Sequence, residues 1–341
     1  MTTRTLLELK HIEVTFTTRR GVLRAVDDLS LSIREGEILG IVGESGAGKS
    51  MTGAAIIGLI DPPGQMSAGE IWFDGARVDE QPERLRGKEI SMIFQDPLTS
   101  LNPLRTVGDQ LVETILAHMS VSREQAEQRA RDGLAEVGID PERIKAYPHA
   151  FSGGMRQRVV IALALATEPK LIIADEPTTA LDVSVQAQVL DLLKRLCRDR
   201  GTSVILITHD MGVIAQTSDR IAVMYAGRLA EIGDTREVLT NPQHPYTQGL
   251  MASTPSVDAK SFGSPLFQIP GSMPKLDALP SGCAFNPRCE HAEDRCRAER
   301  PSLKADRAAC WLLEANPKQE AKAKAKAKTK SGQNVGREDA A

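Results

Sequence analysis

The stretch GESGAGKS, residues 43–50, follows the apolar run ILGIV at 38–42 and precedes a segment patterned as a helix. It fits the pattern G-x4-G-K-[ST] in the strand, loop, helix context that this pattern requires. Glycines let backbone N–H groups surround phosphate oxygens, and the next helix directs its positive N-terminal end at them. Lys49 would reach the terminal phosphates, and Ser50 would ligate Mg2+. The alternative interpretation of the motif is a glycine-rich turn that binds no ligand. The motif predicts nucleotide binding by Gly43, Glu44, Ser45, Gly46, Ala47, Gly48, Lys49, Ser50 and Met51.

A second motif, LIIADE at residues 171–176, is an apolar run of strand length that ends in two carboxylates. Parallel-sheet proteins place their sites at the carboxyl ends of the strands. Asp175 would hold Mg2+, directly or through water, and Glu176 would polarise the water that attacks a γ-phosphate. A solvated acidic strand end is the alternative. Together with the glycine-rich loop, this motif predicts hydrolysis of a nucleotide.

Apolar patterning indicates the fold class. Strand patterning covers 6–16, 29–33, 171–174 and 203–207, and helical patterning covers 107–119 and 123–137 in a helical subdomain at about 96–160. One face of a further helix carries Val185, Val189, Leu192, Leu193 and Leu196. Strands that alternate with helices predict an α/β domain with a mostly parallel sheet. After Asn241 prolines recur and periodicity fades, which predicts a second, loop-rich module.

Composition and charge limit the class of protein. The 341 residues are 41% hydrophobic and 26% charged, which is typical of a folded globular protein. The net charge of -3 gives no basic surface for nucleic acid, so we expect no nucleic-acid partner. The apolar runs are far shorter than the ~18 residues that span a bilayer. The N-terminus shows no secretory signal, so we expect a cytosolic chain. The Lys/Ala-rich tail at 313–341 is predicted to be disordered.

A third motif, FSGGMRQR at residues 151–158, lies upstream of the acidic strand. With it, the sequence resembles the nucleotide-binding subunit of an ATP-binding cassette (ABC) transporter. The resemblance implies a P-loop NTPase fold with a mostly parallel core sheet, antiparallel N-terminal strands and the helical subdomain. It also implies two ATP molecules held between head-to-tail subunits, where Ser152, Gly153 and Gly154 contact the nucleotide of the other subunit. Phe151 and Met155 replace the leucine and glutamine of many members, a departure we expect to be tolerated.

Four more positions match motifs of this family. Gln95 in SMIFQDP matches the Q-loop, and Asp182 in ALD matches the D-loop that reaches across the dimer. His209 in LITHD matches the switch histidine, a hydrogen-bonding partner of the γ-phosphate. Phe16 lies where the family keeps an aromatic residue on adenine, although a core phenylalanine is the alternative. The catalytic residues implied by the resemblance are Glu176, His209 and Gln95, and the implied Mg2+ ligands are Ser50, Gln95 and Asp175.

The resemblance continues beyond the cassette. NPQHPYTQGLMASTP from Asn241, and IPGSMPKLDALPSGCAFNPRC up to Cys289, resemble the C-terminal extension of the oligopeptide and dipeptide importer branch. We therefore divide the chain into a nucleotide-binding domain at 5–240, an extension at 241–312 and the tail. EPTTALDVSVQAQ and GESGAGKSMTG resemble the D-type ATPase of that branch.

This branch implies an ATPase that uses ATP and Mg2+ to drive peptide import from the cytoplasmic face of the inner membrane. The implied partners are a paralogous F-type ATPase, two membrane permeases and an extracytoplasmic solute-binding protein. Three alternatives stay open from the sequence: the same role for nickel, glutathione or another small solute; a soluble cassette ATPase outside transport; and a metal or redox sensor in which the ATPase is the regulator.

Four cysteines near the C-terminus have the spacing C-x5-C-x6-C-x13-C: Cys283, Cys289, Cys296 and Cys310. In a reducing compartment, clustered thiols suggest a metal centre rather than disulfides. The spacing lacks the C-x2-C of a zinc ribbon, and some members of the importer branch bind a [4Fe-4S] cluster through such cysteines. Structural zinc and unligated buried thiols are the alternatives. Cys197, beside an apolar helix face, is predicted to belong to the core.

Overall fold

A six-stranded and a four-stranded sheet form the centre of the molecule in the computed structural model, which describes residues 4–19, 21–179, 181–254, 267–304 and 307–314. The four-stranded sheet is antiparallel, with strand order β2-β1-β4-β5. Its strands are β1 (Thr5–Thr18), β2 (Gly21–Arg34), β4 (Gly64–Phe73) and β5 (Ala76–Arg77). The expected antiparallel N-terminal strands are confirmed, and the second is much longer than the 29–33 predicted.

The six-stranded sheet has the order β10-β9-β3-β8-β7-β6. Its strands are β3 (Ile38–Val42), β6 (Ile90–Ile93), β7 (Leu171–Asp175), β8 (Ser203–Ile207), β9 (Arg220–Tyr225) and β10 (Arg228–Asp234). All neighbouring pairs are parallel except β9 and β10, which confirms the mostly parallel sheet. Parallel strands end at one edge, so the loops after β3, β6, β7 and β8 meet there.

Alternate residues of these strands enter two separate cores, because successive side chains of a strand point to opposite faces. Ile172 and Ala174 of β7 belong to a core shared with the helices and the extension. Leu171 and Ile173 belong to a core shared with β1, β2 and β4 of the other sheet. Both faces of the parallel sheet are therefore covered by apolar side chains, which explains why these strands are continuous apolar runs in the sequence.

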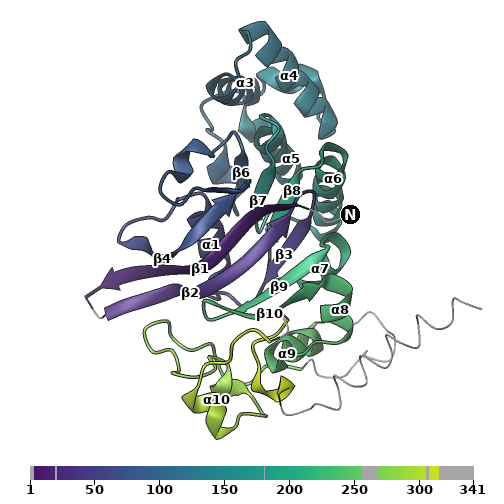
Figure 1. Cartoon of the computed structure of the whole chain (residues 1–341). Helices are drawn as coiled ribbons and strands as arrows, with labels where there is room; N and C mark the ends of the chain where they lie inside the picture. Colours follow the sequence, from purple (N-terminus) through teal and green to yellow (C-terminus); the bar gives the residue numbers. More distant parts are fainter. Residues whose placement is uncertain (1–3, 20, 180, 255–266, 305–306, 315–341) are drawn as a thin grey trace, which may run out of the picture.

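The described helices are α1 (Lys49–Ile56), α2 (Pro97–Ser100), α3 (Val107–His118), α4 (Arg123–Glu136), α5 (Gly153–Leu165), α6 (Val183–Arg200), α7 (Met211–Thr217), α8 (Thr235–Thr240), α9 (Pro245–Ser253) and α10 (Asp294–Ala298). Helices α3 and α4 lie at one end of the molecule, and α8, α9 and α10 lie toward the other (Figure 1). Short 3-10 turns are η1 (Pro82–Arg84), η2 (Pro141–Lys145), η3 (Pro148–Ala150), η5 (Asn286–Arg288) and η6 (Trp311–Leu313). Both helices expected at 107–119 and 123–137 are present, and Ser122 caps α4 through a capping box with Gln125. Within the described part of the chain, every helix is too short or too polar to span a bilayer.

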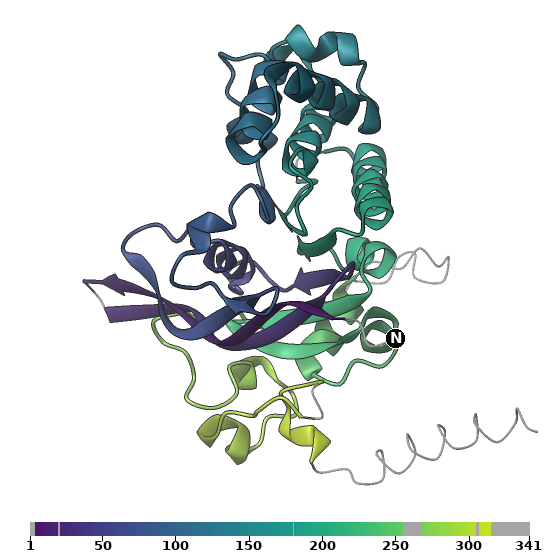
Figure 2. The ribbon, with the colours of Figure 1, turned by 45° about the horizontal axis from the view of Figure 1, so that its top comes forward.

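The loop-rich extension lies at the end of the sheets opposite to α3 and α4, as both views show (Figures 1 and 2). It returns to the six-stranded sheet through an antiparallel bridge between Glu231 of β10 and Ala308. These observations confirm the α/β fold class. Of the tail predicted to be disordered at 313–341, residues 315–341 lie outside the described residues, and Leu313 ends the turn η6.

Candidate functional site

The loop Gly43–Ser50 joins β3 to α1 and needs glycine at two positions. Gly43 has a φ of 154°, and a Cβ placed on it would lie 2.2 Å from the carbonyl oxygen of Met224. Gly48 has a φ of 96°, and its Cβ would lie 2.5 Å from the carbonyl oxygen of Ala25. Both glycines therefore allow a backbone path that other residues would block. The path places a row of backbone N–H groups at the N-terminus of α1, where an anion binds well.

Lys49 lies inside this loop. Its Nζ donates to the carbonyl oxygens of Gly43, at 2.8 Å, and Glu44, at 3.0 Å. Burial lowers the pKa of Lys49, and the negative charges of Glu176 and Asp175 oppose that shift. The ammonium group is thus held at the mouth of an anion site, on neutral acceptors that a phosphate can replace.

Ser50 and Asp175 bring two oxygen ligands together at the edge of the sheet. The Ser50 hydroxyl donates to Asp175 Oδ1 over 2.9 Å. Burial raises the pKa of Asp175, the hydrogen bond from Ser50 opposes this, and the charge of Glu176 adds to it. A cation would relieve the burial of this charge, and Mg2+ prefers oxygen ligands that include one or two carboxylates and substrate phosphates. The pair fits the Mg2+ site expected there.

Glu176 is the centre of a hydrogen-bond network that gathers three strand ends. Its Oε2 accepts from Gln95 Nε2 and from the Thr179 hydroxyl, each over 2.9 Å, and its Oε1 lies 3.1 Å from His209 Nδ1. Burial raises the pKa of Glu176, but the hydrogen bonds from His209 and Thr179 and the charges of His209 and Lys49 outweigh it, so the pKa is lowered. The carboxylate is thus ionised and ready to accept a proton from water.

The backbone at Glu176 is held in an unfavourable conformation. Its φ is 46°, in the left-handed region that favours glycine, and its N–H donates to the carbonyl oxygen of Ile207 over 2.8 Å. The sequence prediction missed Thr179. In the structure its N–H donates to the carbonyl oxygen of Glu176 over 3.1 Å and so closes a turn. The signal that could have identified it is its position three residues after Glu176 in EPTT.

Two protein-family models match the chain: "ABC transporter" over residues 26–179, and "Oligopeptide/dipeptide transporter, C-terminal region" over residues 230–296. The dipeptide transport ATP-binding protein DppD of Bacillus subtilis is 48% identical over 319 residues, which cover 90% of this chain and 95% of DppD. The chain belongs to the ATP-binding proteins of ABC transporters. The oligopeptide transport ATP-binding protein OppD of Salmonella typhimurium is 50% identical over 303 residues, covering 87% of this chain and 89% of OppD.

Solved structures agree with this family. The ATP-binding cassette MJ0796, solved as a dimer in a post-hydrolysis state with ADP and Pi, has a TM-score of 0.61 and 29% identity; the match covers 68% of this chain and 99% of that one. The chain is therefore an ABC ATPase, a class that uses ATP and Mg2+.

In this ABC ATPase the residues Ser152, Gly153 and Gly154 of the FSGGMRQR motif, here called the signature, lie at the start of α5, where Ser152 and Gly153 are exposed. Ser152 caps α5, and its side chain accepts from the N–H of Met155, whereas Gly153 is exposed. A Cβ on Gly154 would lie 2.5 Å from Val185 of α6, so the signature packs against the helix that follows Asp182. The side chain of Asp182 is exposed and does not cap α6. The hydrogen bonds that the structure gives Ser152 stay within α5 and do not reach the phosphate-binding loop.

The remaining predicted nucleotide residues differ in exposure. Ser45 and Gly46 are exposed, Ala47 is fully buried, and Met51 packs on the core between the sheets. Phe16 of β1 is half-buried, and its ring lies close to the backbone of β4, where a Cβ on Gly64 would be 2.5 Å from the ring. This packing agrees with Phe16 as a core residue. Because the residue is only half-buried, it also agrees with Phe16 stacking on adenine.

The four cysteines of the extension line one cavity, which is about 20 Å3 in volume. A cavity of that size holds about one water molecule. Among the residues that the structure describes, there is no group of three or more His, Cys, Asp or Glu side chains placed to hold a metal ion. The expected iron–sulfur cluster therefore has no support in this arrangement. Burial raises the pKa of Cys283, Cys289 and Cys310. Cys197 is fully buried on α6, which confirms its place in the core.

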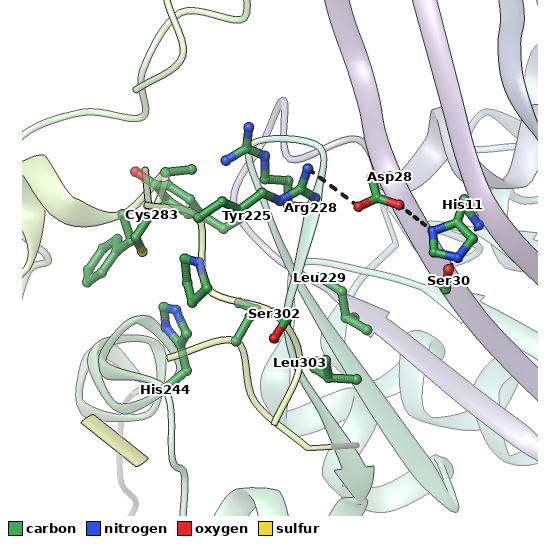
Figure 3. Close-up of a pocket in the computed structure, with 16 residues that line it drawn as sticks. His11, Asp28, Ser30, Tyr225, Arg228, Leu229, His244, Cys283, Ser302 and Leu303 are labelled. Carbon is green, nitrogen blue, oxygen red and sulfur yellow. Dashed lines mark hydrogen bonds and ion pairs between the residues drawn. The ribbon is translucent and has the colours of Figure 1, made fainter. Parts of the chain in front are cut away.

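A further cavity of about 250 Å3 lies between the sheets and the extension (Figure 3). His11 and Asp28 line one side of it, and Tyr225, Cys283 and His244 line the other. The sequence prediction missed it, because its walls come from segments far apart in the chain. Its lining does not include any residue of the phosphate-binding loop, so it is separate from the nucleotide site.

Proposed function

We propose that this ABC ATPase hydrolyses ATP to drive the import of dipeptides or oligopeptides. One observation carries the proposal: the chain that matches the ABC transporter family also has a C-terminal region matched to oligopeptide and dipeptide transporters. The relatives at about half identity are named as dipeptide and oligopeptide transport proteins, which supports the same class of solute here.

We propose the following roles for the residues of the site. Lys49 and the N–H groups of the loop bind the phosphates, and Ser50, Asp175 and Gln95 hold Mg2+, which neutralises charge on the phosphates. Glu176 accepts a proton from the attacking water, because its carboxylate is ionised and lies at the open edge of the sheet. His209 orients Glu176 through the 3.1 Å contact and hydrogen-bonds the γ-phosphate.

The exposed signature supports a site completed by a second ATPase. Ser152, Gly153 and Gly154 lie at the N-terminus of α5, where backbone N–H groups attract an anion, and Asp182 is exposed beside them. We propose that these residues contact ATP bound by a paralogous F-type ATPase in a head-to-tail dimer. The proposed further partners are two permeases and an extracytoplasmic solute-binding protein, with this subunit at the cytoplasmic face of the inner membrane. The proposed domains remain 5–240 and 241–312.

The test is ATP turnover by the assembled transporter in vesicles, with a solute-binding protein loaded with one solute at a time. We expect stimulation of ATP hydrolysis and uptake of labelled dipeptide or oligopeptide. Nickel and glutathione are tested in parallel with the same vesicles. Uptake of one of these solutes, with no response to any peptide, would refute peptide import and leave the ATPase role in place.

A metal centre at the four cysteines is a separate proposal, which rests on their spacing in the sequence and on the single cavity that all four residues line. Coordination would replace the thiol protons, so metal binding would offset the burial that raises the pKa of Cys283, Cys289 and Cys310. Metal and sulfide analysis of anaerobically purified protein decides the question, beside a Cys289→Ser/Cys296→Ser variant. Iron with sulfide that the variant lacks supports a cluster; zinc supports a structural ion; and protein free of metal refutes both.

A further inference from the structure

The C-terminal extension contacts the phosphate-binding loop directly. The backbone N–H of Glu44 donates to Tyr246 Oη over 2.9 Å. Arg288 Nη1 donates to both carboxylate oxygens of Glu44, over 3.0 and 2.9 Å. The methyl group of Met273 lies over the loop, where a Cβ on Gly46 would be 3.3 Å from it. Three residues of the extension thus reach two positions of GESGAGKS, Glu44 and Gly46.

Tyr246 is fixed on the extension side of this contact. Its side chain is fully buried, and its ring packs on Tyr225 and Phe285, with centroid separations of 4.6 and 5.4 Å. Helix α9 is in turn anchored to β10, because the buried Glu231 accepts the N–H of His244 over 2.9 Å. The hydroxyl of Tyr246 is therefore held at one place relative to the six-stranded sheet.

Arg288 is fixed as firmly as Tyr246. Its side chain is 5% exposed, and its Nε donates to the carbonyl oxygen of Pro270 over 2.8 Å. A buried guanidinium is stable only with a counter-ion and hydrogen-bond acceptors. The described structure pairs it with Glu44, whose side chain is 29% exposed. The position of the Glu44 carboxylate is thus set by the extension.

Glu44 is consequently held at three points. Tyr246 accepts its N–H, Arg288 binds its carboxylate, and its carbonyl oxygen accepts from Lys49 over 3.0 Å. We propose that Tyr246 and Arg288 are positioning residues for ATP: they fix Glu44, and through it the loop that receives the phosphates. A loop that is already ordered does not lose conformational entropy when the nucleotide binds, so its affinity is higher. The proposal rests on nucleotide binding, whatever solute the transporter carries.

The structure gives the test conservative variants. Tyr246→Phe removes the hydroxyl and keeps the ring in its aromatic packing, Arg288→Met removes the charge, and Arg288→Lys keeps the charge without the planar fork. The matched control is Arg297→Met, which removes an arginine of the same extension whose side chain is 59% exposed and paired with Asp294 on α10. Each is made in the full-length chain.

Equilibrium binding of MgATP is the first measurement. We expect the Kd to rise about 3- to 10-fold in Tyr246→Phe, the loss of one hydrogen bond, and about 10-fold or more in Arg288→Met. Arg288→Lys recovers part of the loss, and Arg297→Met binds like the original chain. In the assembled transporter, KM for ATP rises in the same order while kcat at saturating ATP changes less than about twofold, because the chemical step is untouched.

A double-mutant cycle tests whether Arg288 acts through Glu44. If it does, Glu44→Gln combined with Arg288→Met binds MgATP no more weakly than Arg288→Met alone. Independent, additive effects in the cycle would overturn the proposal. So would MgATP affinity within about twofold of the original in Tyr246→Phe and Arg288→Lys, with unchanged melting temperatures. If Arg288→Met does not fold, Tyr246→Phe and Glu44→Gln give the same decision. If the variants change MgATP affinity as expected but the transporter does not take up peptide, only the proposal of peptide import is contradicted.

Discussion

Replacement of Glu176 by glutamine separates charge from geometry at the proposed site of hydrolysis. A glutamine with its carbonyl oxygen at the position of Oε2 keeps the 2.9 Å hydrogen bonds from Gln95 and Thr179. The amide nitrogen of the glutamine then faces His209 Nδ1. In the neutral imidazole, Nδ1 can accept a hydrogen bond from this amide. The variant should fold and bind MgATP as before, because only the negative charge is lost.

The expected loss of turnover follows from the role of the carboxylate. A general base contributes about 10²- to 10⁴-fold to a rate, which corresponds to about 2.7 to 5.5 kcal/mol at ~1.36 kcal/mol per tenfold. Because its hydrogen bonds lower the pKa of Glu176, the group is fully ionised at neutral pH and all of that contribution is removed by the change.

The assay is steady-state ATP hydrolysis by the assembled transporter at saturating MgATP, with MgATP affinity measured separately. Glu142→Gln is the control, because its side chain is 85% exposed and pairs with Arg131 in the helical subdomain. Turnover within about threefold of the original, at unchanged affinity, would remove Glu176 from the role of base.

Three further predictions concern other parts of the chain. Ser152→Arg should impair the ATP site of the partner subunit, because the start of α5 is exposed; ATP-dependent dimer closure equal to the original would contradict a shared site. Burial lowers the pKa of His244 from its ordinary 6.5 to about 4. Between these pH values the unfolded chain therefore binds more protons than the folded chain. The free energy of unfolding is highest above pH 6.5 and falls as the pH is lowered toward 4. The loss is roughly 1.4 kcal/mol at pH 5.5, and unfolding midpoints of His244→Gln should change less than those of the original chain between pH 7.5 and 5.5. Burial raises the pKa of Cys197 to about 12, so iodoacetamide should not modify this thiol in the folded chain, and rapid alkylation would contradict its place in the core. Cys197→Ser should lower the free energy of unfolding by about 1 to 3 kcal/mol without changing the metal content.

Local sequence signals predicted the elements that carry the site. The two helices predicted at 107–119 and 123–137 follow from apolar periodicity, and the structure caps them with Thr106 and Ser122. Strands β3, β7 and β8 follow from short apolar runs. Strands β4, β9 and β10 were not predicted. Strand β9 does carry an apolar run at 221–225, which the prediction missed. Strands β4 and β10 lack such a run; β4 pairs with the distant β1, and β10 pairs with its neighbour β9.

The sequence by itself determined the phosphate-binding loop and the acidic strand end. The residues of each motif are neighbours in the chain, and the pattern G-x4-G-K-[ST] between a strand and a helix predicts phosphate binding. The tertiary structure alone decided which of these groups touch. Gln95, Thr179 and His209 meet at Glu176 because parallel strands end at a common edge. The extension contacts Glu44 from more than two hundred residues away, and the four cysteines of the extension line one cavity. Such contacts depend on how separate segments pack, and no local pattern of residues encodes that packing.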